Sequence, residues 1–147
     1  MTEIKSRNGN SLLRLRVGIV FTIVGLFIYI LGANPSIFGL DRSPVRGFIQ
    51  IAVFLIGLAI ICIGGFITLN TLWNGEEKSI VADFGLRLVA TGYVIAVATG
   101  MADVFGLGNH TFPNIPYFGP WQAIGVMIGE AVILVGFLMI IPYPSRR

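Results

Sequence analysis

The hydrophobic and polar positions of this chain fall into four long apolar stretches separated by short polar segments. Uncharged runs cover residues 17–40, 47–75, 88–102 and 104–129. A helix needs about 20 apolar residues to cross the roughly 30 Å hydrocarbon layer of a bilayer. Because flanking charged side chains can reach the interface, the pattern predicts spans near residues 15–34, 47–72, 84–104 and 121–141. The sequence therefore predicts an all-α integral membrane protein, a bundle of four transmembrane helices.

The distribution of basic residues predicts the orientation of these helices. Only 12% of the residues are charged and the net charge is +3, whereas about 25% are charged in ordinary soluble proteins. Eight of the ten basic residues precede the first span, lie between the second and third spans, or close the sequence: Lys5, Arg7, Arg14, Arg16, Lys78, Arg87, Arg146 and Arg147. By the positive-inside rule, both termini are cytoplasmic. The charge thus indicates orientation, and we expect no nucleic-acid partner.

We expect a single transmembrane domain preceded by a short basic segment. Residues 1–14 are assigned to a cytoplasmic basic N-terminal segment, and residues 15–147 to the transmembrane domain. The first span has the basic start and apolar run of a signal peptide, but Leu31-Gly32-Ala33 is a poor cleavage site. The sequence therefore favours a retained helix and a multi-pass protein of the cytoplasmic membrane.

The two halves of the chain share an ordered series of residues. Gln50 and Gln122 are the only glutamines, and each is followed by glycine seven and fourteen positions later. Further segments match in the same order: Leu13–Leu15 with Leu86–Leu88, and Ile37–Leu40 with Val104–Leu107. The series predicts two tandem helical hairpins that arose by duplication; coincidence in a glycine-rich apolar chain is the alternative.

Glycine recurs at a spacing of seven residues in the predicted spans. Helices associate in lipid through close packing, and glycine lets their backbones approach. We therefore expect these glycines to line helix–helix contacts, within the bundle or between subunits, rather than a pore. The glycines at this spacing are Gly18, Gly25, Gly32, Gly57, Gly64, Gly85, Gly92, Gly129 and Gly136; Gly125 forms a small-xxx-small pair with Gly129.

One carboxylate, Glu130, lies in the middle of the fourth predicted span, far from any other charge in the sequence. A charge near the bilayer midplane is costly, so such a residue faces the bundle interior or a water path. As a neutral acid Glu130 would hydrogen-bond across the bundle, and the side chains expected at its depth are Tyr93, Thr91 and Thr22. The sharper alternative is a proton or cation site formed by these residues.

The segment between the third and fourth spans, residues 103–120, is unusually apolar for an outer loop. It contains several aromatic residues and prolines and little charge. Such a loop packs over the bundle, lies in the headgroup region, or docks a partner. The candidate docking residues are Phe105, Phe112, Tyr117 and Phe118.

The sequence contains none of the common catalytic or metal-binding sets. His110 and Asp103 could offer two ligands, whereas structural metal sites use four and catalytic sites three. Cys62 is the only cysteine, and no catalytic triad, P-loop or dinucleotide fingerprint is present. Arg87 is expected to pair with Asp83 one helical turn earlier. We expect no enzymatic activity, no cofactor and no bound metal.

A duplicated two-helix hairpin with a carboxylate only in its fourth span resembles the proteolipid ring subunit of vacuolar-type ATPases. In that family the carboxylate carries the proton or sodium ion, so the resemblance implies this role for Glu130. The chain departs from the family in lacking its glycine run and polar cytoplasmic loop, and in the predicted outer position of both hairpin loops. The long segment 103–120 also replaces a tight turn. These departures do not support membership.

Two functions follow as expectations from the sequence. The leading one is a non-enzymatic accessory or scaffold subunit that packs against other membrane subunits or against copies of itself. The alternative is a small proton- or cation-coupled transporter or channel subunit that uses Glu130 as its site.

Overall fold

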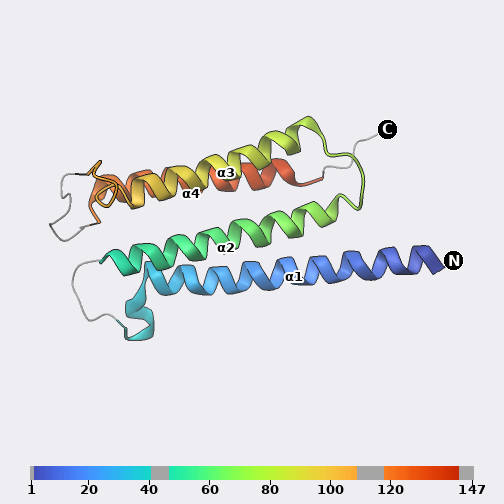
Figure 1. Cartoon of the computed structure of the whole chain (residues 1–147), viewed down its shortest axis with the longest axis horizontal. Helices are drawn as coiled ribbons and strands as arrows, with labels where there is room; N and C mark the ends of the chain where they lie inside the picture. Colours follow the sequence, from blue (N-terminus) through green and yellow to red (C-terminus); the bar gives the residue numbers. More distant parts are fainter. Residues whose placement is uncertain (1, 41–46, 109–117, 143–147) are drawn as a thin grey trace.

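The computed structural model describes residues 2–40, 47–108 and 118–142, with only the backbone for residues 2–8. It consists of four long helices and one short 3-10 helix (Figure 1). The elements are α1 (Thr2–Ala33), η1 (Pro35–Phe38), α2 (Phe48–Leu72), α3 (Ile80–Gly100) and α4 (Pro120–Ile140). All four α-helices are long and apolar enough to cross a membrane. The prediction of an all-α, multi-pass membrane protein is confirmed at this level.

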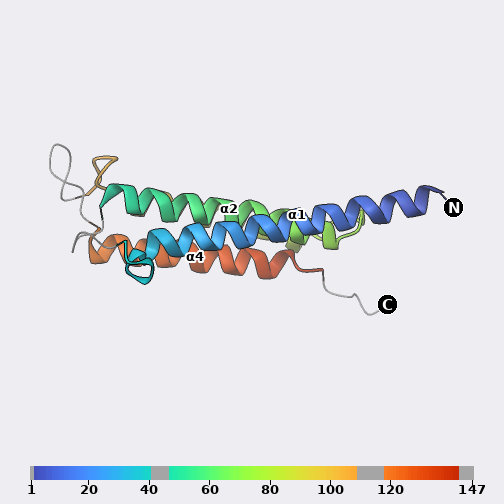
Figure 2. The same ribbon diagram turned by 90° about the horizontal axis from the view of Figure 1, so that it is seen from below.

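The helices run side by side along the long axis of the molecule and form two hairpins. Helix α1 packs along α2, and α3 packs along α4, with fewer contacts between the pairs (Figures 1 and 2). The start of α1, the α2–α3 connection and the end of α4 lie at one end of the bundle. We call this the termini end, and the opposite end, which holds the α1–α2 and α3–α4 connections, the loop end.

Local sequence accounts for where the helices begin and end. Ser79 accepts a hydrogen bond from the backbone N–H of Ala82 (3.2 Å), which caps the start of α3. Pro120 occupies the first turn of α4, where its missing N–H is not needed. After α2 the chain turns through Asn74 and Gly75, with φ of 51° and 86°, in the left-handed region that Asn and Gly adopt most readily.

The limits of the helices do not coincide with those of the predicted spans. Helix α3 covers Ile80–Gly100, whereas the third span was predicted near residues 84–104. Helix α1 also continues without a break through most of the basic N-terminal segment. The shift of α3 arises because Ser79 starts the helix one turn before Asp83, which charge counting had placed outside the span.

All ten glycines that were expected to pack helices lie at contacts within the two hairpins. A Cβ atom added at Gly25 would come within 3.0 Å of the carbonyl oxygen of Gly57, and one added at Gly92 within 2.6 Å of that of Gly129. Gly18 faces Gly64, and Gly85 faces Gly136, in the same manner. These positions therefore serve packing within each hairpin, and none of the ten faces outward toward a second subunit.

The paired glycines recur at one offset along the sequence. Gly85 and Gly92 lie the same number of residues after Gly18 and Gly25 as Gly106 lies after Gly39, and Gly106 and Gly39 both have left-handed φ (75° and 66°). The match of Ile37–Leu40 to Val104–Leu107 has this offset, whereas the match of Leu13–Leu15 to Leu86–Leu88 has a larger one. Duplication of the hairpins stays a prediction.

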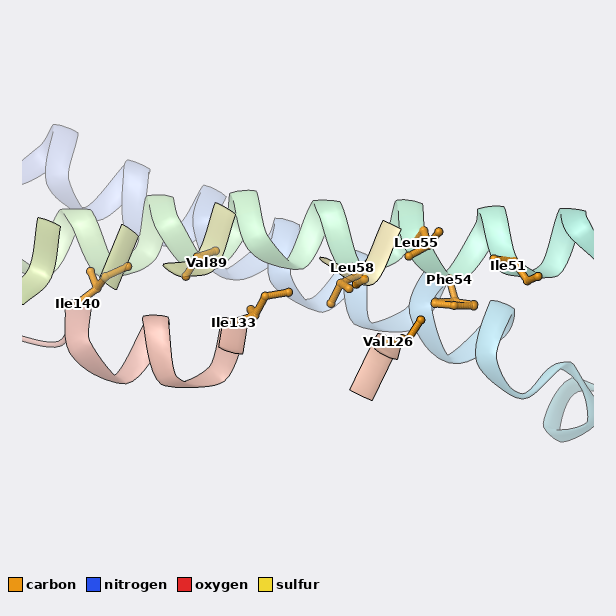
Figure 3. Packing of buried hydrophobic residues seen from close by; sticks show 9 residues of the cluster. Ile51, Phe54, Leu55, Leu58, Val89, Val126, Ile133 and Ile140 are labelled. Carbon is orange, nitrogen blue, oxygen red and sulfur yellow. The ribbon is translucent and has the colours of Figure 1, made fainter. Parts of the chain in front are cut away.

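The hydrophobic core lies between α2 and the second hairpin. It is formed by buried side chains of three helices (Figure 3): Ile51, Phe54, Leu55, Leu58, Val89, Ala96, Val126, Ile133 and Ile140. Helix α1 adds partly buried residues at its edge, Tyr29 and Ala33. Helix α2 therefore contacts both its hairpin partner and the other hairpin, and it positions the groups described next.

Candidate functional site

Glu130 forms a hydrogen bond that joins the two hairpins. The Tyr29 hydroxyl, on α1, donates to Oε1 of Glu130, on α4, with an oxygen–oxygen distance of 2.6 Å. Both residues are half-buried, and Glu130 lies midway along α4. A carboxyl oxygen can accept this bond whether or not the other oxygen carries a proton. The contact can therefore serve a neutral interhelical link or a titrating group.

Packing of aromatic rings holds Tyr29 in this position. The Tyr29 ring lies edge-to-face against Phe54, with centroids 6.1 Å apart, and Phe54 contacts Phe118 in the same way at 6.0 Å. Gly57 supports the arrangement, because its missing side chain lets the Tyr29 backbone lie directly against α2. Phe54 on α2 and Phe118, just before α4, thus help to orient the phenol of Tyr29 toward Glu130.

The hydrogen-bond partners expected for Glu130 from the sequence differ from the one observed. The hydroxyls of Thr22 and Thr91 donate to carbonyl oxygens of their own helices, those of Gly18 (2.9 Å) and Arg87 (2.8 Å). The Tyr93 hydroxyl points to the carbonyl oxygen of Leu55, at 3.4 Å. The structure thus directs these three hydroxyls to other acceptors, and their part in a proton or cation site with Glu130 stays a prediction. Threonine in a helix commonly bonds to the preceding turn in this way.

Tyr29 was missed because partners were matched by counting residues from the ends of the spans. Its backbone lies only one turn before the end of α1, so counting placed it at the outer interface. The long phenol ring reaches back toward the bundle centre. One sequence signal was available, since a tyrosine within an apolar span needs a partner for its hydroxyl.

The candidate docking loop is only partly described. Phe105 is 57% exposed, whereas Phe118 packs on Phe54 and borders the core. Phe112 and Tyr117 lie outside the described residues, as does His110. Of the two described candidates, Phe118 therefore covers the bundle and Phe105 is exposed.

Asp83, Arg87 and Asp103 occupy structural positions. Asp83 and Arg87 form the expected i,i+4 pair at 3.8 Å, with side chains 60% and 77% exposed. Such an exposed pair contributes little to stability. Asp103 is buried within the turn that follows α3. Among the residues described, no three His, Cys, Asp or Glu side chains gather as a metal site would require.

The geometry thus offers a hydrogen bond between two side chains of different hairpins within a largely apolar bundle. It can fix the two hairpins relative to each other, or it can relay a proton between a phenol and a carboxyl group. Comparison of the chain with models of protein families, with curated proteins and with solved structures finds no match. The comparisons therefore do not distinguish between these two uses.

Proposed function

We propose that this protein is a non-enzymatic accessory or scaffold subunit of a larger membrane complex. The observation that carries the proposal is the Tyr29–Glu130 hydrogen bond, which engages the one mid-span carboxyl group in a contact between hairpins. A polar pair of this kind in lipid fixes helix arrangement, because neither group has water as an alternative partner. In this role Glu130 stabilises the arrangement of the helices and takes no part in transport.

Exposed apolar side chains at the loop end supply a surface on which another membrane subunit can dock. They lie on the connections and at the start of α4: Ile37, Phe38, Leu40, Phe105, Leu107 and Trp121. Contiguous exposed apolar surface commonly marks an interaction site. The glycines already contact the neighbouring helix of their own hairpin. The loop end is therefore the more suitable surface for a partner.

The proposal includes the orientation of the bundle in the membrane and its origin by duplication. We place the termini end in the cytoplasm and the loop end outside, since the basic residues concentrate at the termini end. The membrane is the cytoplasmic membrane. We also infer that the hairpins are duplicates, which the equivalent glycine pairs and the two left-handed glycines, Gly39 and Gly106, support.

Gentle solubilisation of the full-length protein from its native membrane tests the accessory role, with native gels and mass spectrometry as readout. We expect a stoichiometric complex with other subunits, which Phe105→Ser/Leu107→Ser disrupts. Ile80→Ser is the matched control, because Ile80 is equally exposed but lies at the start of α3, at the termini end. Recovery of the wild-type protein alone, or only with copies of itself, would contradict the proposal.

A second candidate function is proton- or cation-coupled transport at Glu130. One observation favours it: the partner of Glu130 is itself a proton-bearing group, and the carboxyl is only half-buried. Proton flux into liposomes discriminates the two functions. A carrier loses flux in Glu130→Gln, whereas a scaffold shows no flux before the substitution and retains its complex afterwards, since glutamine still accepts from Tyr29.

A further inference from the structure

Two adjoining hollows lie between α1 and α2 at the termini end. The first has a volume of about 350 Å³ and is lined mainly by polar residues of α1, the end of α2 and the following turn. The second, of about 340 Å³, is lined mainly by apolar residues. Both hollows share Arg14, Asn70 and Thr71, so together they form one continuous site with a polar and an apolar half.

The two halves are stacked along the helix axes. The polar half is lined by Asn10 and Asn74, and the apolar half by Val17 and Phe66. Val17 lies two turns after Asn10 on α1, and Phe66 lies about two turns before Asn74, so both are nearer the middle of the spans. A molecule in this site therefore has its polar part at the membrane surface and its apolar part alongside the helices, as a phospholipid does.

The charges of the polar half favour an anion. Arg14 and Lys78 line it together with one carboxylate, Glu76, which leaves an excess of one positive charge. Among the side chains that the structure describes, Arg14 and Lys78 form no ion pair, unlike Arg87, which pairs with Asp83. Lys78 Nζ lies 5.2 Å from the centroid of the Phe66 ring, a cation–π contact that holds the ammonium group where the two halves meet.

Trp73 gives the site a fixed wall. Its indole Nε1 donates to the carbonyl oxygen of Ile140 on α4 at 2.8 Å, so the ring is anchored to the second hairpin. Tryptophan is the residue typical of the headgroup level of a bilayer. The volume of the polar half falls in the range of small-molecule sites, about 300–1,000 Å³.

We propose that this site binds one anionic phospholipid of the surrounding leaflet. Arg14 and Lys78 contact the headgroup phosphate, and one acyl chain lies along Leu13, Val17, Phe66 and Ile67. Basic pockets at the ends of transmembrane helices recognise anionic headgroups in this way. The inference goes beyond the accessory role and depends only on the chain being embedded in a membrane, so it can fail or hold independently of that role.

Fluorescence of Trp73 in vesicles tests the proposal. The chain has two tryptophans, and Trp121→Phe leaves Trp73 as the only one. We expect brominated phosphatidylglycerol, diluted in phosphatidylcholine, to quench Trp73 more strongly than brominated phosphatidylcholine at the same fraction. Arg14→Gln/Lys78→Gln should reduce this preference by about thirtyfold in relative affinity, since each of the two basic groups near the surface contributes about 1 kcal/mol.

Two controls decide what the preference means. Arg87→Gln removes a cation from the same end of the bundle but outside the site, and should leave the preference unchanged; Arg14→Lys should retain most of it. Equal quenching by both lipids, or the same loss in Arg87→Gln, would overturn the proposal. Loss of the preference in millimolar inorganic phosphate, but not in sodium chloride of equal ionic strength, would also overturn it and indicate a site for free phosphate.

Discussion

The contact between Tyr29 and Glu130 shows how one polar pair can set the arrangement of an apolar bundle. Lipid tails are as apolar as leucine, so apolar surface alone does not drive one helix against another within the bilayer. A hydroxyl and a carboxyl group that meet across hairpins restrict the arrangement to one in which both are satisfied. The edge-to-face contacts of Tyr29 and Phe54 further limit the directions open to the phenol.

We expect Tyr29→Phe to lower the free energy of unfolding by about 1 kcal/mol, the usual size of such bonds in membrane proteins. The measurement is reversible unfolding in mixed micelles, with Glu130→Leu, which removes the acceptor, and the double variant completing a cycle. Tyr93→Phe is the control and should lose less, because the hydroxyl of Tyr93 lies 3.4 Å from its acceptor. Additive effects of Tyr29→Phe and Glu130→Leu would show that the pair is not coupled.

The sequence identified one member of this pair and not the other. Glu130 stands out because any carboxylate within an apolar span is conspicuous. Tyr29 does not, because the choice of partner depends on which helices are adjacent and on how far a ring reaches along them. The spacing of residues within a single span shows neither which helices are adjacent nor how far a ring reaches. The hydroxyls of Thr22 and Thr91 were equally uninformative, since a helix can satisfy them internally.

At the scale of helices, the close contact between α3 and α4 depends on glycine. We expect Gly92→Ala to destabilise the protein by about 2 kcal/mol, because the added methyl group would lie 2.6 Å from the carbonyl oxygen of Gly129. Gly9→Ala is the matched control. No atom lies within 4 Å of a Cβ at that position, and alanine favours a helix over glycine by up to about 1 kcal/mol.

Unfolding in mixed micelles compares these two glycine variants directly. The expected signs are opposite, with Gly92→Ala less stable than wild type and Gly9→Ala equal to it or more stable. Equal stabilities of the two variants would show that the hairpin accommodates a methyl group at this close contact.

The start of α3 provides a second test at this scale. Ser79→Ala removes the acceptor for the Ala82 N–H and should cost about 1 kcal/mol. Ser79→Asp retains an acceptor and should stay close to wild type. Hydrogen exchange at the Ala82 amide reports the same contact locally. Unchanged exchange in Ser79→Ala would indicate that the cap does not define the helix start.

The number and type of elements were predictable because membrane helices have a strong length requirement. Their limits were less so. The prediction for the third span began near residue 84 because charge counting excluded Asp83, whereas the side chain of Ser79 begins the helix at Ile80. The glycine spacing indicated close packing but left open whether it occurred within one chain or between chains.

At the scale of the whole molecule, the arrangement of the ends makes a topological prediction. In a Cys62→Ala background, Leu107→Cys lies at the loop end, and Leu107 is 78% exposed. Glu77→Cys lies at the opposite end and is also exposed. In intact cells we expect a membrane-impermeant maleimide to label the first variant and not the second. Labelling that is reversed would place the termini outside.

The closest helix contacts lie within each hairpin, and this has a consequence for the biosynthesis of the protein. The tightest approaches of backbone to backbone occur within each hairpin, so α1 and α2 can reach their packed arrangement while the rest of the chain is still on the ribosome. Glu130 arrives with the last helix. The bond to Tyr29 therefore forms after all four spans have entered the membrane, and it marks the completion of assembly.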